Sequence, residues 1–445
     1  MGMLTIEDIL SATGGRVIFH NSHSFAGIAI DSRTIQEGEL FVALKGSRSD
    51  GHAFIGAALE KGNGALVSSE QIALVPDKTV IFVHNTLKAL QDIARHVRSK
   101  RDIPVVAVTG SNGKTTTKEL IAAILGTQYK VLKNTGNLNN HIGLPLSLSR
   151  LTDADEVIVL EMGASGPGEI KALCDIAKPT YGVLTNIGYA HLEGFGDIET
   201  VRKTKFELLD YPGVAVVNAD DTFMMEGIRE SGFQGIIVRY GITNAADVFA
   251  SDISLREKGS VFLLHLGADD AIEVSPKISG MFNIYNLLAA ASIGKLFAVG
   301  PEKIKKAIDS FTGVPMRLEF KEQDGMKIIS DIYNANPASV EEAVRELSRI
   351  KKGRAIAVLG DMLELGSYGE DAHRKIGRLL TDLKIETFIA VGPLMCLAAS
   401  EFQGDVYTMQ TSVEAGRLLK TIWQRGDTVL IKGSRGMHME KVLEE

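Results

Sequence analysis

The sequence is poor in cysteine and has no long apolar run. Two of its 445 residues are cysteines, Cys174 and Cys396, and their separation matches no metal-binding or redox motif. We expect both thiols to lie in the core of a protein from a reducing compartment. No apolar run approaches the ~20 residues that a membrane-spanning helix needs, and Glu7 and Asp8 stand where a signal peptide has its apolar segment. These absences predict a cytoplasmic protein that is not inserted in a membrane.

An excess of basic residues is also missing. The chain has 48 Lys and Arg against 55 Asp and Glu, which gives a net charge of −7. A general nucleic-acid binder would normally present a basic face, so we expect no nucleic-acid partner. The hydrophobic fraction of 45% and the charged fraction of 23% are typical of a folded globular protein. A length of 445 residues predicts about three domains at ~150 residues each.

One stretch has the order of elements that binds a phosphate chain. The apolar run 105–108 predicts a buried strand, 119–125 predicts a helix, and the loop between them holds Gly110, Gly113 and Lys114. In such a loop the glycines let backbone N–H groups converge on phosphate oxygens, and the helix start adds its positive dipole end. The sequence therefore predicts a nucleoside triphosphate site, and an ordinary β–α turn is the alternative.

Two further features refine this loop. Lys114 supplies a mobile cation, and the hydroxyl of Thr115 is placed to reach Mg²⁺. Val108 stands where the common G-x-x-x-x-G-K-[ST] pattern has its first glycine, so the loop is a variant of that pattern.

The expected elements divide the chain into three units of mixed α and β structure. Residues 1–84 hold short strands that end in polar loops and predict a small α/β unit for substrate binding. Residues 85–314 open with an amphipathic helix and continue with alternating strands and helices, which is typical of a parallel sheet; 245–278 predict an antiparallel edge. Residues 315–445 repeat the alternation without a phosphate loop and predict a doubly wound, Rossmann-like sheet.

Polar residues at the strand ends are candidates for the site. Glu161 ends an expected buried strand, and a carboxylate beside a phosphate loop is a good Mg²⁺ ligand, with a helix cap as the alternative. His191 follows the next strand end, and Lys205 lies on an expected helix over 201–209. Taken alone, a structural histidine and a solvated lysine are the simpler interpretations. The segment 31–33 either forms a plain turn or belongs to a binding edge.

Taken together, these motifs resemble a known family. The segments 109–117, 135–145, 161–164 and 168–170 are similar to those of the Mur ligases, the ATP-dependent amide-forming enzymes of peptidoglycan synthesis. Further segments resemble the family member that joins D-alanyl-D-alanine to UDP-N-acetylmuramoyl-tripeptide. These further segments are 31–33, 188–196, 333–336, 360–366 and 429–435.

The resemblance implies a nucleotide and metal site. The residues that would hold the ATP phosphates are Gly110, Ser111, Asn112, Gly113, Lys114, Thr115 and Thr116. Two Mg²⁺ ions are implied, the first on Thr115 and Glu161, and the second on His191 and a carbamylated Lys205. Asn283 and Asn286 match the adenine-side segment of the family, while Arg317 and Asp331 would reach the phosphate and the ribose.

The resemblance also implies substrate sites. Asn137, Asn139 and Asn140 would line the reacting centre, and Lys114, Asn139, His191 and Lys205 would take part in catalysis. Asp31, Ser32 and Arg33 would hold the UDP end of the substrate. Tyr333, Asn334 and Asn336 would face the incoming dipeptide. The three units imply closure between the second and the third, and we expect a monomer.

The sequence departs from the family pattern at three positions. Phe282 stands where relatives carry a histidine before Asn283, and Met316 replaces the glycine often found before Arg317. Ser330 stands where an acid often precedes Asp331. None of these positions belongs to the phosphate loop or to the expected metal ligands.

The chemistry implied is activation of a carboxylate as an acyl phosphate, followed by attack of an amine. The nearest alternatives are a sibling ligase that adds a single amino acid to the same precursor and a folylpolyglutamate synthase. A phosphate-loop switch or transport ATPase would hydrolyse ATP and join nothing. A kinase would release a stable phosphorylated product.

Overall fold

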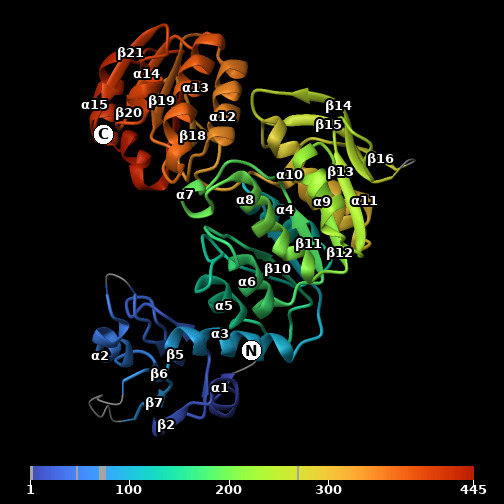
Figure 1. Ribbon diagram of the computed structural model, residues 1–445, viewed down its shortest axis with the longest axis vertical. Helices are drawn as coiled ribbons and strands as arrows, with labels where there is room; N and C mark the ends of the chain where they lie inside the picture. Colours follow the sequence, from blue (N-terminus) through green and yellow to red (C-terminus); the bar gives the residue numbers. More distant parts are fainter. Residues whose placement is uncertain (1–3, 47–48, 70–76, 268–269, 445) are drawn as a thin grey trace.

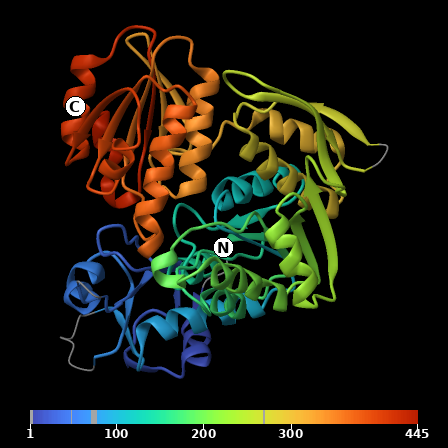
Figure 2. The same cartoon turned by 45° about the horizontal axis from the view of Figure 1, so that its top comes forward.

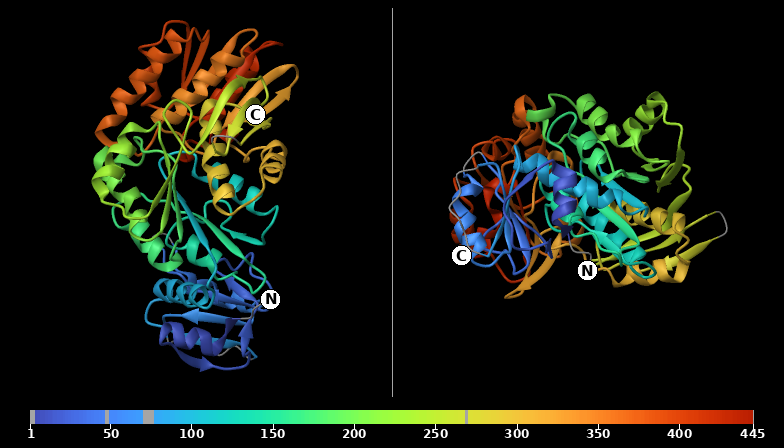
Figure 3. Two further views of the ribbon diagram at one scale, coloured as in Figure 1. Left: turned by 90° about the vertical axis from the view of Figure 1, so that its right-hand side faces the viewer. Right: turned by 90° about the horizontal axis from the view of Figure 1, so that it is seen from below.

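The computed structural model describes residues 4–46, 49–69, 77–267 and 270–444. Its three units follow one another in the sequence and lie in a row along the longest axis of the molecule (Figure 3). The first unit (blue in Figure 1) and the third (orange and red) lie on opposite sides of the second. This arrangement agrees with the expected mixed α/β class, while the bounds 1–84, 85–314 and 315–445 stay a prediction.

The first unit is built on a five-stranded sheet. Its order is β2 (Arg16–Phe19), β7 (Thr79–Phe82), β6 (Gly64–Val67), β5 (Glu39–Val42) and β4 (Gly27–Ala29). Only β2 pairs in the antiparallel sense within this sheet as described. A short pair of β1 (Leu4–Thr5) and β3 (Ser24–Phe25) lies beside it, with helices α1 (Ile6–Thr13), η1 (Gly51–Phe54) and α2 (Ile55–Leu59). The expected polar loop at 45–52 includes Ser47 and Arg48, which lie outside the described residues.

Helix α3 (Thr86–Ser99) connects the first unit to the second. Its apolar stripe includes Leu90 and Ile93, which are fully buried against the core of the first unit. On the next turn the buried Arg98 side chain crosses to the second unit, where its Nε donates to the carbonyl of Ala177 at 3.0 Å. The amphipathic helix expected to open the second unit is thus present, and it packs on both units.

The second unit contains a nine-stranded sheet. Its order is β16 (Ala271–Val274), β15 (Ser260–His265), β14 (Val248–Leu255), β13 (Ile236–Gly241), β12 (Val214–Asn218), β11 (Tyr181–Leu184), β8 (Val105–Thr109), β10 (Val157–Glu161) and β9 (Val131–Lys133). The strands from β9 to β14 are parallel, and β14, β15 and β16 pair in the antiparallel sense. The antiparallel edge expected at 245–278 is therefore confirmed for its described residues.

Helices cover both faces of this sheet. One apolar layer packs α4 (Lys114–Leu125), α10 (Met281–Leu296) and α11 (Pro301–Ser310) on one face. The other layer includes α5 (Gly143–Leu148), α6 (Glu169–Ala177), α8 (Ile198–Phe206) and α9 (Thr222–Ser231), with α7 (Leu192–Phe195) and η2 (Glu207–Asp210) nearby. Both layers are dense with valine, leucine and isoleucine because a parallel sheet is covered on both sides.

The third unit contains a six-stranded sheet. Its order is β17 (Glu319–Gln323), β18 (Met326–Asp331), β22 (Thr428–Lys432), β19 (Ala355–Gly360), β20 (Thr387–Val391) and β21 (Asp405–Met409). All pairs except β17–β18 are parallel. The helices are α12 (Pro337–Ile350), η3 (Gly366–Tyr368), α13 (Gly369–Asp382), α14 (Met395–Ala399), α15 (Ser412–Ile422), η4 (Arg435–Met437) and η5 (Met439–Val442). They cover both faces (Figure 2), as the expected doubly wound sheet requires.

The pattern of apolar residues predicted the central strands and the long helices of the second and third units but missed several other strands. Among the missed strands are β9, β17 and β21, which lie at sheet edges, and β13, which lies between β12 and β14; each is short or carries exposed residues that hide the periodicity. Cys174 is buried, as expected, whereas Cys396 is half-buried, and both are free thiols. Within the described part of the chain, no helix is both long and apolar enough to cross a bilayer.

Candidate active site

The carboxyl ends of three central strands meet at the phosphate loop. Glu161 of β10 pairs with Val108 of β8, and Leu184 of β11 pairs with Thr109. A cavity of about 590 Å³ opens at this edge and extends to the third unit. Its lining includes Asn112, Lys114, Thr115, Asn139, Asn140, Glu161, His191, Asn283, Asn286, Arg317, Asp331, Tyr333, Asn334 and Asn336. Most of the residues that the resemblance singled out are therefore brought together.

The two loop glycines are required by the backbone. Gly113 has φ 78°, and a Cβ on it would lie 2.3 Å from Oδ1 of Asn286. Gly110 has φ 143°, and a Cβ on it would lie 2.0 Å from Oγ1 of Thr185. Val108, where the common motif has glycine, is instead a fully buried residue of β8. The loop therefore turns two residues later than the common pattern, and Asn186 accepts from its N–H groups at Ser111 and Asn112, each at 2.9 Å.

Lys114 lies over the loop that it follows. Its Nζ donates to the carbonyl oxygens of Gly110 at 2.8 Å and Ser111 at 2.9 Å. Burial in the cavity lowers the pKa of Lys114, and the nearby guanidinium of Arg317 lowers it further, although Glu161 opposes the shift. Incoming phosphate oxygens are better partners for this ammonium than carbonyl groups are, because hydrogen bonds between charged groups are stronger.

Glu161 has hydrogen-bond partners at its backbone and at one carboxylate oxygen, but not at the other oxygen. Nδ2 of Asn139 donates to Oε1 of Glu161 at 2.7 Å. Asn134 binds the backbone of Glu161 twice, with Oδ1 accepting from its N–H at 2.9 Å and Nδ2 donating to its carbonyl at 2.9 Å. Oε2 of Glu161 is buried and has no hydrogen-bond partner among the described residues. A buried carboxylate oxygen without a partner is costly unless a cation or donor joins it, so this position suits a Mg²⁺ ion.

Asn134 and Lys118 are positioning residues that the sequence reasoning missed. Lys118 is fully buried, and its Nζ donates to the carbonyl of Asn134 and lies 3.0 Å from Oε1 of Glu119. Asn134 also donates through Nδ2 to the carbonyl of Leu138 at 2.8 Å, next to Asn139. The only signal in the sequence was that Asn134 directly precedes the segment 135–145.

His191 and Lys205 lie close to the cavity in different ways. His191 lines it, and burial lowers the pKa of its imidazole, which favours the neutral ring that a metal ligand needs. Lys205 is 2% exposed and does not line the cavity; its Nζ donates to the carbonyl of Ala164, a lining residue, at 3.4 Å. Burial lowers the pKa of Lys205 to about 7, and the charge of Lys114 contributes. The solvated-lysine alternative is therefore wrong.

The described residues do not contain a ready-made cluster of ionisable metal ligands. Among the described residues, no three His, Cys, Asp or Glu side chains gather so as to hold a metal ion. The expected first ion uses a hydroxyl and one carboxylate, Thr115 and Glu161, and the second needs a modified lysine. The partnerless oxygen of Glu161 and the lowered pKa values of His191 and Lys205 fit these two ions.

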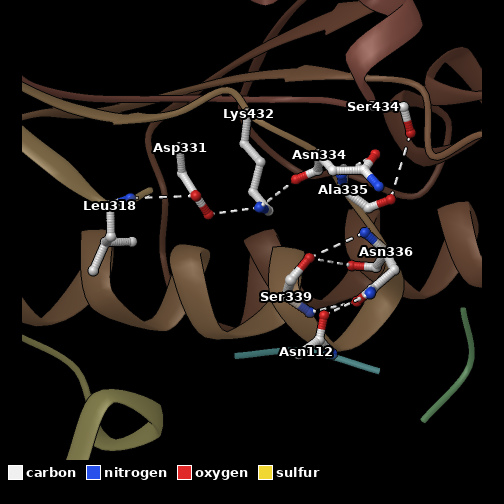
Figure 4. Close-up of polar contacts among 9 residues, drawn as sticks. All are labelled: Asn112, Leu318, Asp331, Asn334, Ala335, Asn336, Ser339, Lys432 and Ser434. Atoms are coloured by element: carbon white, nitrogen blue, oxygen red, sulfur yellow. Dashed lines mark hydrogen bonds and ion pairs between the residues drawn. The ribbon is translucent and has the colours of Figure 1, made fainter. Parts of the chain in front are cut away.

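The third unit contacts the phosphate loop directly. Nη2 of Arg317 donates to Oγ1 of Thr115 at 3.0 Å, and the guanidinium lies 4.0 Å from the ring centroid of Tyr333. Nδ2 of Asn336 donates to Oδ1 of Asn112 at 2.7 Å (Figure 4). These contacts place a cation and an amide of the third unit beside the nucleotide loop of the second, as expected for a closed arrangement.

Other expected residues of the third unit have partners within that unit. Asp331 accepts from Nζ of the buried Lys432 at 2.5 Å and from the backbone of Leu318 at 3.2 Å. Asn336 caps α12, with its Oδ1 accepting from the N–H of Ser339 at 2.9 Å (Figure 4). Oδ1 of Asn334 accepts from the N–H of Ala335 at 2.9 Å. A ribose or dipeptide contact for these residues stays a prediction.

The residues expected on the adenine side are buried at the start of α10. Asn283 donates through Nδ2 to the carbonyl of Ser279 at 2.7 Å, and Asn286 donates to Oδ1 of Asn283 at 3.2 Å. Oδ1 of Asn286 also accepts from Oγ1 of Thr117 at 3.2 Å, which ties α10 to α4. The half-buried Phe282, which replaces a histidine, packs against the apolar core of the third unit.

The other two residues that depart from the family pattern, Met316 and Ser330, also have unusual structural environments. Met316 has φ 63°, a left-handed conformation that favours the glycine expected there. Ser330 is fully buried, and its Oγ has no partner among the described residues. Neither residue lines the main cavity.

Four of the expected substrate-binding residues are not among the described residues that line the cavity. Asp31, Ser32 and Arg33 form a turn of the first unit in which the Arg33 side chain, 86% exposed, pairs with Asp31 at 2.6 Å. Asn137 is exposed, and it is not among the described residues that line the cavity. Asp220 and Asp221, which also follow a strand, bind backbone N–H groups of 242–244 and cap α9.

Family models match all three units. The model of the Mur ligase middle domain matches residues 108–294, and that of the Mur ligase glutamate ligase domain matches residues 316–435. The model of the Mur ligase family catalytic domain matches residues 24–98.

Individual relatives cover nearly the whole chain. The UDP-N-acetylmuramoyl-tripeptide–D-alanyl-D-alanine ligase of Bacillus subtilis is 36% identical over 94% of this chain and 92% of its own. The crystal structure of MurF from Acinetobacter baumannii superposes with a TM-score of 0.91 at 32% identity, covering 100% and 98% of the two chains. MurF ligase from Thermotoga maritima in complex with ADP gives 0.81 at 29% identity, covering 94% and 96%. By its sequence and its structure, this chain belongs to the Mur ligase family.

Proposed function

We propose that this chain joins D-alanyl-D-alanine to UDP-N-acetylmuramoyl-tripeptide and cleaves ATP to ADP and phosphate. The observation that carries the proposal is the shared cavity, which the phosphate loop lines from one unit and Arg317, Tyr333 and Asn336 line from another. A nucleotide held on the loop therefore meets a substrate held by the third unit. Relatives of that name, at 36% and 34% identity over 94% of this chain, support the choice of substrates.

In the first step a carboxylate oxygen of the tripeptide attacks the γ-phosphorus of ATP, and ADP leaves. The products are an acyl phosphate and ADP. Lys114 and Arg317 stabilise the negative charge that is redistributed over the phosphate oxygens, and the N–H groups at the start of α4 do the same. This stabilisation acts mainly in the transition state, so it raises kcat.

In the second step the amine of D-alanyl-D-alanine attacks the acyl carbon. A tetrahedral intermediate forms, and it collapses to the amide with release of phosphate, while the amine proton passes to solvent or to a nearby base. Asn139 donates to Glu161, and we propose that it lines the reacting centre. Asn334 and Tyr333, which line the cavity, would face the incoming dipeptide. Holding the acyl phosphate and the amine side by side raises the reaction rate through proximity.

Two Mg²⁺ ions and a carbamate complete the proposal. When bound, the ions offset the charge of the phosphate oxygens. Thr115 and Glu161 would hold the first ion, and His191 with a carbamylated Lys205 would hold the second. A carbamate forms only on a neutral amine, and the lowered pKa of Lys205, about 7, supports this modification.

The remaining parts of the proposal concern the binding of the UDP group, the cellular compartment and the oligomeric state. Asp31, Ser32 and Arg33 bind the UDP end, which leaves the peptide to reach across to the phosphate loop. The enzyme works in the cytoplasm as a monomer. A free, half-buried Cys396 thiol agrees with a reducing compartment.

A coupled phosphate-release assay across a panel of UDP-sugar peptides and amines tests the function. We expect release only with UDP-N-acetylmuramoyl-tripeptide and D-alanyl-D-alanine together, with ADP as the sole nucleotide product by chromatography. Release with a single amino acid would favour a sibling ligase. Release without an amine would favour a switch or transport ATPase, and a stable phosphorylated product would favour a kinase. AMP formed in step with product would contradict the acyl-phosphate mechanism.

A further inference from the structure

Two loops of different units meet beside the cavity. The first is the 188–196 loop, which contains α7, and the second is the 361–369 loop, which contains η3. The rings of Tyr189 and Tyr368 are stacked, with centroids 4.6 Å apart and planes 17° apart. The backbone N–H of Glu193 donates to the carbonyl of Glu364 at 3.1 Å. In Figure 1, α7 lies at the edge of the second unit that faces the third.

The centre of this contact is a hydrogen bond between the side chains of His191 and Glu364. Nδ1 of His191 lies 2.5 Å from Oε2 of Glu364. Both residues have left-handed backbones, with φ 53° at His191 and φ 64° at Glu364. Residues other than glycine avoid this region, and where they adopt it the surrounding contacts hold them there, often at functional sites. An incidental surface pair does not require two such backbones.

Both residues line the same cavity as Lys114 and Glu161. An imidazole whose Nδ1 donates to a carboxylate has its proton on that nitrogen, so the lone pair of Nε2 is available. Carboxylate partners of this kind fix the orientation and tautomer of metal-ligating histidines.

We propose that Glu364 is a positioning residue that orients His191 as a cation ligand when the third unit lies against the second. This inference rests on the proposed metal role of His191. His191 belongs to the second unit and its orienting carboxylate to the third, so the second cation site is complete only in the closed arrangement. Domain closure and cation binding then favour each other.

The test measures Mn²⁺ binding, as a substitute for Mg²⁺, by electron paramagnetic resonance of the free ion with a non-hydrolysable ATP analogue. The variants are Glu364→Ala, Glu364→Gln, His191→Ala and the double variant His191→Ala/Glu364→Ala. Glu370→Ala is the control, because Glu370 is an exposed acid of the same unit. Glu364 is itself an exposed residue, with 57% of its side chain accessible, so these variants are expected to fold.

For Glu364→Ala we expect the weaker of two Mn²⁺ affinities to fall by about 10- to 100-fold. Glu364→Gln keeps an oxygen that accepts from Nδ1, so its loss should be smaller. In the His191→Ala background, removing Glu364 should cause no further loss, because Glu364 acts through His191. Glu370→Ala should bind Mn²⁺ like the wild type.

Two results would overturn the inference while leaving the proposed metal role of His191 in place. The first is an unchanged Mn²⁺ affinity in Glu364→Ala when His191→Ala has lost it. The second is an added loss in the double variant, which would mean that Glu364 binds the cation or a substrate directly. An unchanged affinity in His191→Ala would instead remove the proposed metal role of His191 and the inference with it. Amide formation by the wild type, measured separately, would show whether the proposed ligase function itself stands.

Discussion

The phosphate loop and the turn at 31–33 are both expected to bind phosphate-bearing substrates, but they are built differently. In the loop, Thr115 is buried, Lys114 is folded onto backbone carbonyls, and Arg317 reaches in from another unit. In the turn, Asp31 and Arg33 bind mainly each other, and the Arg33 side chain is 86% exposed. The loop is held by buried contacts from two units, whereas the turn presents an exposed cation to solvent.

This difference separates two kinds of contribution to catalysis. Groups fixed around the reacting phosphate stabilise charge in the transition state without reorganisation, so their loss lowers kcat. A solvent-exposed arginine far from the reacting atoms binds substrate and transition state equally, so its loss raises KM. The predictions that follow test this separation, beginning with the largest expected effect.

Lys114→Ala should lower kcat by about 1,000-fold or more, because it removes a cation that faces the transferred phosphoryl group. Steady-state kinetics with saturating substrates measure this change. The matched control is Lys130→Ala, an exposed lysine of the same unit, which should keep wild-type kcat. A Lys114→Ala variant with near-normal kcat would mean that the loop holds the nucleotide without assisting its chemistry.

Lys205→Ala should lower kcat by about 100-fold, and acetate should restore part of the activity by supplying the missing oxygen ligand. Lys203→Ala, on the same helix but exposed, is the control and should be silent. CO₂-depleted buffer should lower the activity of the wild type and leave that of Lys205→Ala unchanged. Full activity of Lys205→Ala without acetate would exclude the carbamate.

Arg33→Ala should raise the KM for the UDP substrate by about tenfold with little change in kcat, since a charge-assisted hydrogen bond contributes about 1.5–3 kcal/mol. Lys61→Ala is the control, because Lys61 is an exposed cation of the same unit. A normal KM for the UDP substrate in Arg33→Ala would remove the substrate role of the turn.

The smallest expected effect concerns pH and two aspartates of the first unit. Burial raises the pKa of Asp8, but hydrogen bonds from Lys100 and Thr5 outweigh it and lower this pKa to about 2. The hydrogen bonds of Arg33 lower the pKa of Asp31 to about 2 as well. A carboxylate with a lowered pKa in the folded state stabilises the fold above its unfolded pKa, and this contribution is lost as pH falls toward 2.

The two aspartates should nevertheless differ in acid unfolding. Asp8 links α1 to α3 through residues 92 positions apart, whereas Asp31 pairs with a residue two positions away that remains its neighbour in the unfolded chain. Asp8→Asn should therefore lower the unfolding free energy at pH 7 and flatten its decline between pH 4 and 2. Asp31→Asn should change both less. Urea unfolding at several pH values measures the difference, and equal effects would contradict it.

The sequence was most informative where the backbone itself forms the site. Gly110, Gly113 and Lys114 lie within five consecutive residues, so the order of strand, loop and helix predicted that they share one loop. Glu161 could be placed because parallel strands end at one edge. Asn134 and Glu364 could not be placed in this way, because each contacts a residue that is distant in the sequence. Asn134 binds Glu161, 27 positions away, and Glu364 binds His191, 173 positions away. Local patterns carry no information on such pairs.

The same limit applies to the fold. The central strands were predicted because both faces of a parallel sheet are buried and their sequence is continuously apolar. The edge strand β21 carries exposed residues such as Asp405 and Val406, and its sequence resembles that of a loop. Lys205 is a further example, because the local sequence predicted its helix but not the burial of its side chain.

The most direct measurement of the central claim follows an oxygen atom. The tripeptide substrate is prepared with ¹⁸O in its terminal carboxylate, and the phosphate released on joining D-alanyl-D-alanine is analysed by mass spectrometry. If the carboxylate attacks the γ-phosphorus, one of its oxygens leaves with the phosphate, so the released phosphate should carry a single ¹⁸O. Unlabelled phosphate, formed together with the amide, would contradict the acyl-phosphate mechanism.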